Sequence, residues 1–266
     1  MKTSWTIFLG LFLTVNFATA QDTLYVYQYG AVLYKRVISA VDSVTFQKMY
    51  TPPSTVTDKD GNVYQTVTIG TQTWMASNLR VTHFRNGESI TNLTVDNDWY
   101  VATYGAWCDY ANLAANGTKY GHLYNWYAVA DSRNIAPTGW HVPTDVEWTT
   151  LENYLIANGY NYDGTTSGNK IAKSLSATTD WNSDTGTGTI GNDLKKNNTS
   201  GFSALPGGYR DGGGPFRVVG GGGAWWSSPE GSTYAWSRYL NGYGSDLGRS
   251  YSTIGYGFSV RCVRDN

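Results

Sequence analysis

The stretch Pro143–Gly159, PTDVEWTTLENYLIANG, decides the fold class. Thr144 is placed to act as an N-cap, Glu147 three residues later completes a capping box, and Gly159 provides a stop signal. We therefore predict one well-formed helix between Thr144 and Gly159. Its apolar side is expected to consist of Val146, Trp148, Leu151, Tyr154 and Leu155.

Outside this helix the sequence alternates between short runs rich in Thr, Val and Tyr and stretches rich in glycine. Such runs are typical of short strands, and the glycine-rich stretches are typical of loops. The sequence therefore predicts an α+β fold with few helices and long irregular loops.

A tight turn is predicted at Asp60-Gly61, between two runs rich in Thr, Val and Tyr. Asp58 and Asp60 resemble part of a calcium loop, but EF-hand spacing requires a Glu six residues after the glycine. Val67 occupies that position. We therefore expect a hairpin and no calcium loop.

The first twenty residues have the organisation of a secretory signal peptide. Lys2 precedes the apolar run IFLGLFLTVNFA, and the small residues of Ala18–Ala20 follow it. Residues 1–20 are thus expected to be removed before Gln21. No later stretch of about twenty apolar residues is present to span a bilayer. The mature chain is expected to be secreted or held at the cell surface.

Three segments are expected after the signal peptide. Residues 21–50 form a short β segment, with a hairpin break at Tyr29-Gly30. Residues 51–57 form a linker, because Pro52 and Pro53 lack the amide hydrogen that a strand needs. Residues 58–266 form the main domain.

Composition excludes partners that are recognised mainly by charge. Charged residues make up 15% of the 266-residue chain and the net charge is −1, whereas aromatic residues also reach 15%. A basic field that would attract nucleic acid is absent from such a sequence. We therefore expect no nucleic-acid partner.

The chain has two cysteines, Cys108 and Cys262. In an exported protein they are placed to form a disulfide that would pin the C-terminal strand to the middle of the domain. Two buried free thiols are the alternative.

The C-terminal stretch Asn241–Cys262, NGYGSDLGRSYSTIGYGFSVRC, combines a segment rich in Tyr, Gly, Ser and Asn with a strand-like end. Tyrosine gives a large amphipathic contact area at low entropy cost, and arginine can anchor a ligand. A flexible linker would have a similar composition, but Trp236, Leu240, Leu247 and Ile254 favour an ordered surface. The candidate ligand-binding residues are Tyr234, Trp236, Arg238, Tyr239, Asn241, Tyr243, Ser245, Asp246, Arg249, Tyr251 and Tyr256.

Six motifs together resemble the Fibrobacter succinogenes major paralogous domain family of exported bacterial proteins. They are DGNVYQTVTIGTQTWMASNLR, YGHLYNWYAVA, PTGWHVPTDVEWTTLENYL, GFSALPGGYR, WWSSPE and YGFSVRCVRD. The resemblance extends from about Asp58 to Asp265. It implies a C-type lectin-like fold, similar to formylglycine-generating enzymes and to the variable proteins of diversity-generating retroelements. It implies no reaction, because one fold hosts many functions.

Site by site, the residues that known chemistries of this superfamily require are not present. The sequence has no Glu-Pro-Asn or Gln-Pro-Asp triplet of calcium-dependent lectins, and WNSD at Trp181–Asp184 is expected to be a polar turn. His83, His122 and His141 lack zinc-site spacing, and His141 is expected to be a hydrogen-bonded structural residue. The glycine run at Gly220–Gly223 lacks the Lys of a phosphate loop. We expect no catalytic residues, no metal and no cofactor.

The sequence therefore predicts an exported, non-catalytic recognition module for a protein or a glycan. A self-associating surface or matrix component is a second interpretation, and an enzyme related to formylglycine-generating enzymes is disfavoured. A further hypothesis concerns residues 231–256, where Lys, Glu, Gln, Met and Trp are absent apart from Trp236, as adenine-directed mutagenesis of Asn codons would require. A Tyr- and Asn-rich repeat common in the family is the alternative.

Overall fold

The structure is a computed structural model that describes residues 6–8, 12–18, 21–28, 31–37, 54–228 and 234–265. The chain divides into two compact units at Pro52 and Pro53. This division falls at the two prolines that the sequence identified as a boundary. Each unit is described by itself below.

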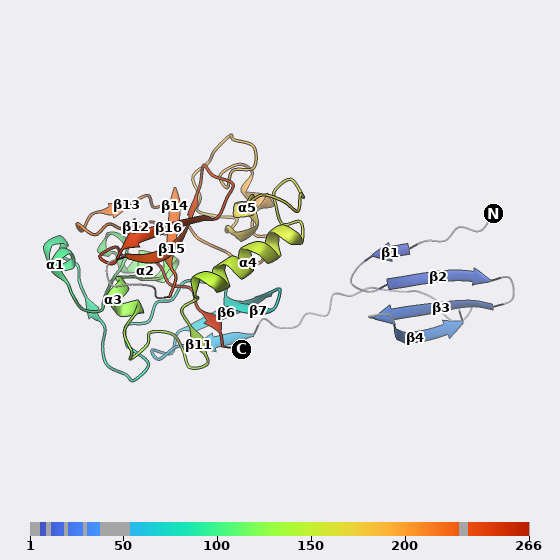
Figure 1. Ribbon diagram of the computed structural model, residues 1–266, viewed down its shortest axis with the longest axis horizontal. Coiled ribbons are helices and arrows are strands. Elements are labelled where there is room, and N and C mark those ends of the chain that lie inside the picture. The colour runs from blue at the N-terminus through green and yellow to red at the C-terminus, as the bar shows by residue number, and fades with distance from the viewer. Residues whose placement is uncertain are drawn as a thin grey trace. The chain divides into compact units, whose positions relative to one another are not determined.

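The first unit contains a four-stranded antiparallel sheet in the order β1-β2-β3-β4 (Figure 1). Its strands are β1 (Thr6–Phe8), β2 (Phe12–Ala18), β3 (Gln21–Gln28) and β4 (Ala31–Val37). Gln28 pairs with Ala31, so β3 and β4 flank the predicted hairpin break. The predicted signal peptide covers β1 and β2, and its removal before Gln21 would leave only β3 and β4 of this sheet. Residues 38–50 of the predicted β segment lie outside the described residues.

The described residues of the second unit form a mixed domain in which short strands and five α-helices, four of them short, are separated by long loops. The helices are α1 (Asp96–Val101), α2 (Ala114–Tyr120), α3 (Trp126–Val129), α4 (Asp145–Ala157) and α5 (Ala172–Leu175), with single 3-10 turns at Tyr110–Asn112 and Leu194–Lys196. This agrees with the predicted class of few helices and long irregular loops. Figure 1 shows α4 as the one long helix of the domain.

The largest sheet of the domain joins its beginning to its end. Its five strands have the order β11-β17-β7-β6-β5. They are β5 (Thr55–Thr57), β6 (Val63–Ile69), β7 (Gln72–Met75), β11 (Trp140–His141) and β17 (Val263–Arg264). The last strand β17 lies between β7 and β11, with Val263 opposite both Trp74 and His141. The C-terminus therefore closes the domain. Strand β5 also lies within residues 51–57, so the predicted linker overlaps the domain.

The predicted hairpin at Asp60-Gly61 is present between β5 and β6, which pair antiparallel from Thr57 opposite Val63. Asp58 fixes this turn as an acceptor, since its carboxylate accepts hydrogen bonds from the amides of Asp60 and Asn62 and from the hydroxyl of Tyr64. Its oxygens are thereby used for turn formation.

The predicted helix is confirmed as α4, with the capping box between Thr144 and Glu147 in place. Gly159 lies just after the C-cap with a φ of +75°, a conformation that favours glycine. The buried side is narrower than predicted, because only Trp148, Leu151 and Leu155 are buried. Val146 is 73% exposed and Tyr154 lies over Gly70 at the surface.

The face of α4 that is buried packs into an aromatic core. The ring of Trp148 lies 4.9 Å from the ring of Trp74 in β7 and 5.8 Å from that of Phe202, centroid to centroid. Large rings bury more than 150 Å² each, so this contact links the helix firmly to the five-stranded sheet. The helix in turn provides a fixed support for the C-terminal strands on its other side.

Three smaller sheets complete the domain. The sheet β14-β15-β16 consists of β14 (Gly222–Trp226), β15 (Tyr234–Asn241) and β16 (Gly248–Thr253). The sheet β10-β9-β8 consists of β8 (Thr91–Asn92), β9 (Ala106–Cys108) and β10 (Leu123–Tyr124). The third pairs β12 (Tyr209–Arg210) with β13 (Phe216–Arg217). Most predicted site residues lie on the first of these sheets.

Candidate functional site

The candidate site is the antiparallel sheet β14-β15-β16, which contains most of the predicted recognition stretch as regular strands. Tyr239 in β15 lies opposite Gly248 in β16, and Trp236 lies opposite Tyr251. Successive side chains of a strand point to opposite faces, so the stretch is divided between two faces of one sheet. The two faces have different chemistry.

One face carries a groove of about 720 Å³. Its lining from β15 and β16 includes Ser237, Tyr239, Ser250 and Ser252. The further lining residues are Asn182, Tyr209, Val218, Val219, Gly221, Gly222, Gly223, Ala224, Leu240, Asn241, Tyr243, Tyr251, Thr253, Tyr256 and Phe258. Every residue of this lining is uncharged at neutral pH. The surface of the groove therefore combines aromatic rings, hydroxyl and amide groups and backbone with the aliphatic side chains of Val218 and Val219.

The aromatic wall of the groove is a cluster of three rings. The ring of Tyr209 lies 5.8 Å from those of Tyr256 and Phe258, and Tyr256 lies 5.4 Å from Phe258. These contacts connect strand β12 to the segment that leads into β17. Because each ring packs on two others, the wall is held in place before any ligand binds.

Tyr239 and Tyr243 provide more exposed rings, with 42% and 60% of their surface accessible. The ring of Tyr239 lies directly over Gly248, where a Cβ atom would overlap it. Because Gly248 has no Cβ atom, the ring of Tyr239 can lie directly on strand β16. The amide of Tyr243 donates to the Asn241 side chain over 3.0 Å, which orders the turn after β15.

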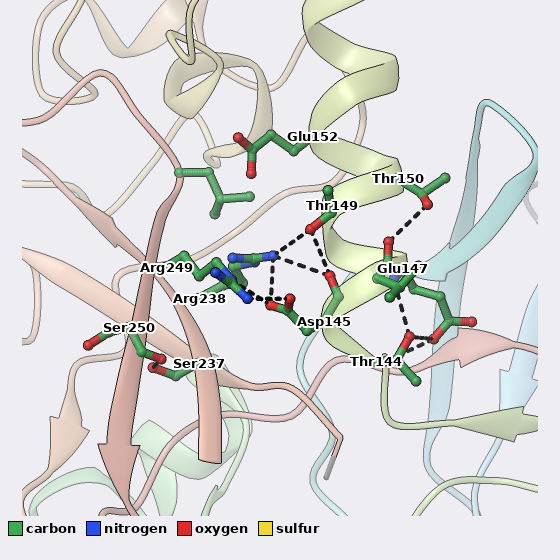
Figure 2. Close-up of polar contacts among 12 residues, drawn as sticks. Thr144, Asp145, Glu147, Thr149, Thr150, Glu152, Ser237, Arg238, Arg249 and Ser250 are labelled. Atoms are coloured by element: carbon green, nitrogen blue, oxygen red, sulfur yellow. Dashed lines mark hydrogen bonds and ion pairs between the residues drawn. The ribbon is translucent and has the colours of Figure 1, made fainter. Parts of the chain in front are cut away.

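The opposite face of the sheet is charged and packs on the first turn of α4. Arg238 contacts Asp145 at 2.9 Å and donates to the hydroxyl of Thr149 over 3.0 Å. Arg249 contacts the same Asp145 through two hydrogen bonds of 3.0 and 2.8 Å, and its guanidinium lies 3.4 Å from the ring centroid of Trp236. Figure 2 shows both arginines converging on Asp145 from the strands.

The structure corrects the predicted role of Arg238. Its side chain is fully buried, so it is not an exposed anchor for a ligand. Burial lowers the pKa of this guanidinium, and the nearby charge of Asp145 partly opposes the shift. Glu152 in α4 also interacts with the charge of Arg238, and burial raises the pKa of this carboxyl group. Arg238 thus attaches β15 to α4, because it lies on the same face of the strand as the core residue Leu240.

The eleven predicted residues therefore fall into three groups. Those that line the groove are Tyr239, Asn241, Tyr243, Tyr251 and Tyr256. Of these, Tyr251 lies opposite Trp236 and its ring packs on that of Trp236, with centroids 3.6 Å apart, so it also belongs to the charged face. Those of the charged face are Trp236, Arg238 and Arg249. Tyr234 lies at the start of β15 outside the groove lining, and Ser245 and Asp246 lie in the turn between β15 and β16.

Sequence reasoning missed much of the groove, including Tyr209 and the run Gly221–Gly223. The glycine run was considered only as a phosphate loop. The position of the glycine run in the sequence could have indicated its role, because the run follows the GFSALPGGYR motif and comes just before the buried pair Trp225 and Trp226. Such a boundary between loop and core is where a backbone-lined floor forms.

Both cysteines are free thiols in the structure, so the predicted disulfide is absent and the alternative of two buried thiols is present. Cys108 lies in the cluster around Trp99 and Leu123, whereas Cys262 lies in the cluster around Tyr124 and Trp226. Burial raises the pKa of Cys108 to about 12 and also raises that of Cys262. Neither thiol is placed to act as a nucleophile.

His141 is hydrogen-bonded on both ring nitrogens, as predicted. Nδ1 lies 2.6 Å from Asp265 and Nε2 lies 2.8 Å from Glu147. Burial lowers the pKa of His141, but the bonds from Asp265 and Glu147 outweigh it, and the pKa is raised overall. The residue joins the C-terminus to the capping box of α4.

Within residues 54–228 and 234–265, no group of three or more His, Cys, Asp or Glu side chains is arranged to hold a metal ion. None of the helices in the described ranges is long and apolar enough to cross a bilayer.

Residues 67–264 match the model of the Fibrobacter succinogenes major domain family. The match covers more than half of the chain and includes α4, both faces of the β14-β15-β16 sheet and β17. Comparisons with curated proteins and with solved structures found no match.

Proposed function

The chain belongs to the Fibrobacter succinogenes major domain family, and we propose that it is an exported, non-catalytic recognition module that binds a neutral glycan in the groove on the β14-β15-β16 sheet. The observation that carries this proposal is the composition of the groove. A volume of about 720 Å³ is lined by tyrosines, serines, glycines and asparagines together with apolar side chains such as Val218 and Val219, and by no charged side chain.

This lining suits a sugar better than it suits a charged or purely apolar ligand. Tyrosine rings offer flat faces for the C–H surface of a pyranose. Ser250 and Ser252 offer partly exposed hydroxyl groups that can donate and accept, whereas Ser237 is buried and its hydroxyl pairs with that of Ser252. The volume is also within the range of small-ligand sites, whereas protein interfaces are typically flatter and larger.

Two further parts of the proposal rest on sequence and topology. Export is supported by the signal-peptide organisation of residues 1–20. A C-type lectin-like fold is supported by the family resemblance, by the insertion of β17 between β7 and β11, and by residues 158–208, whose regular elements are short. N-terminal sequencing of the exported protein tests the first part, and a chain beginning at Gln21 is the expected result.

The binding test uses the full mature chain on an array of neutral glycans, with Tyr239→Ala as the groove variant. Tyr234→Ala is the matched control, because Tyr234 lies on the same strand with a similar exposure of 49% but outside the groove lining. We expect Tyr239→Ala to weaken binding about tenfold or more, which corresponds to about 1.4 kcal/mol. Tyr234→Ala should bind as the wild type does.

Retained binding in Tyr239→Ala, or an equal loss in both variants, would contradict the groove as the glycan site. Circular dichroism of each variant separates loss of binding from loss of folding. Absence of binding to every neutral glycan on the array would overturn the glycan part of the proposal.

A second candidate function is self-association, which the edge of the same sheet favours. β16 is the last strand in the order β14-β15-β16, so one side of it has no neighbouring strand among the described residues. An unpaired edge is a template for pairing with a second copy. Sedimentation velocity at rising concentration tests this, and Thr253→Lys on the edge should reduce any growth in mass.

A further inference from the structure

A cavity of about 1010 Å³ lies outside the groove and shares no lining residue with it. One side is formed by the hairpin turn and the segment after β7, through Lys59, Asp60, Arg80 and His83. The other side is formed by β9, α2 and the residues between α2 and β10, through Trp107, Asp109, Thr118 and His122. Unlike the groove, this cavity is lined mainly by charged and hydrogen-bonding side chains.

The carboxylates of the cavity are held by imidazoles. Asp60 accepts from the amide and hydroxyl of Thr82 and lies 2.6 Å from Nδ1 of His83. These bonds lower the pKa of Asp60 against the opposing effect of its burial, which is the largest single contribution. On the other side, Oδ1 of Asp109 lies 2.7 Å from Nδ1 of His122.

The Asp109–His122 pair is built into the wall of the cavity. Both side chains are only 13% exposed. Gly117 in α2 makes room for them, because a Cβ atom there would overlap the carboxylate of Asp109. The ring of His122 also packs against that of Trp107 with centroids 4.1 Å apart. The pair is therefore fixed in orientation before a ligand enters.

The cations of the cavity have no such partners. Among the described residues, neither Lys59 nor Arg80 forms an ion pair with a carboxylate. Nε of Arg80 donates to the side chain of Asn62 over 3.1 Å, which orients the guanidinium and leaves its two terminal nitrogens for another acceptor. The stem of Lys59 lies along Gly87 at the rim.

We propose that this cavity is a second binding site, and that it takes a sugar acid, a ligand with both a carboxylate and several hydroxyl groups. The carboxylate is required because Arg80 and Lys59 are cations without an acidic partner, and guanidinium–carboxylate bonds are among the strongest hydrogen bonds in proteins. Hydroxyl groups are required because Asp109 and Asp60 can only accept hydrogen bonds when ionised. A simple anion would satisfy the first set and be repelled by the second.

The test is isothermal titration calorimetry of the full mature chain with glucuronate, with its uncharged methyl ester and with inorganic phosphate. We expect glucuronate to bind, and the ester and phosphate to bind at least about tenfold more weakly, or by about 1.4 kcal/mol. Equal binding of the ester would overturn the role of the carboxylate. Phosphate binding as tightly as glucuronate would overturn the role of the hydroxyl groups, and no binding of glucuronate would overturn the site.

Variants locate the site. Arg80→Gln and Lys59→Gln should each weaken glucuronate binding about tenfold, whereas Arg80→Lys, which keeps the charge but not the paired donors, should lose less than Arg80→Gln. Lys195→Gln is the matched control, because Lys195 is an exposed lysine in the 3-10 turn Leu194–Lys196 and lines neither site. An equal loss in this control would show that only the net charge matters.

Two measurements keep this proposal separate from the glycan groove. Tyr239→Ala should leave glucuronate binding unchanged, because Tyr239 does not line the cavity. If Arg80→Gln does not fold, Lys59→Gln still tests the site, because Lys59 is exposed and outside the core.

Discussion

The substitution Asp145→Asn tests whether the charged face of the β14-β15-β16 sheet attaches it to α4. Asparagine has nearly the same shape but removes the charge that Arg238 and Arg249 share. Arg238 is fully buried, and its Nε and Nη1 atoms have no hydrogen-bond partner in the described part of the chain. The substitution therefore leaves the buried guanidinium without its ion-pair partner, and only the nearby carboxylate of Glu152, which forms no ion pair with it among the described residues, still offsets its charge.

The expected loss can be built from three contributions. Removing one partner of a buried ion pair costs about 3–5 kcal/mol. The value for Arg238 should fall near the lower end, because Thr149 and the Asp145 carbonyl still accept its hydrogen bonds. The pair with Arg249, which is 46% exposed, adds only about 0.5 kcal/mol. Loss of a negative charge in the first turn of α4 adds another ~0.5 kcal/mol.

We therefore expect Asp145→Asn to lower the free energy of unfolding by about 4 kcal/mol, or the Tm by roughly 10 °C for a domain of this size. Urea unfolding of the wild type and the variant, with the m-values compared, measures the difference. Arg249→Gln is the control, and it should cost less than about 1.5 kcal/mol because that pair is exposed. A loss below about 1 kcal/mol for Asp145→Asn, or equal losses for both variants, would refute the assignment of Arg238 as the buried partner.

Three other predictions follow from the described contacts. The pKa of His141 is raised in the folded protein, so its bonds to Asp265 and Glu147 stabilise the fold fully below the ordinary histidine pKa of about 6.5. This stabilisation is lost as pH rises through the pKa of His141 in the folded protein. The Tm advantage of wild type over His141→Gln should therefore shrink from about pH 6 to pH 9. Gly248→Ala should displace the ring of Tyr239 and weaken glycan binding without unfolding the domain. Unchanged affinity on the array would show that glycan binding does not depend on the position of this ring over Gly248. Cys108 and Cys262 should resist a thiol reagent in the native protein and react in urea, and rapid native labelling would contradict their burial.

The parts of the fold that depend on neighbouring residues were predictable from the sequence. The capping box of Thr144 and Glu147, the stop at Gly159 and the hairpin at Asp60-Gly61 all use contacts within a few residues. The side chains that share the apolar face of α4 were less predictable. Val146 would be buried only if a segment distant in sequence packed against that side of α4, and no segment of the described chain does so.

The candidate site was predictable only in part, because it combines residues far apart in the sequence. Tyr239 and Tyr256 come from the predicted stretch, whereas Asn182 and Tyr209 come from earlier loops. Arg238 was misplaced because the stretch was interpreted as one ordered binding surface, whereas a strand of period two places Arg238 on the buried face with Leu240.

The position of β17 in the middle of the five-stranded sheet has a consequence for biosynthesis. Val263 pairs with Trp74, so the sheet cannot be completed until almost the whole chain has left the ribosome. Contacts between residues this distant in sequence also form slowly. Folding of this domain is therefore expected to wait for β17, and a fragment that stops before Val263 should leave β7 and β11 without the strand that lies between them.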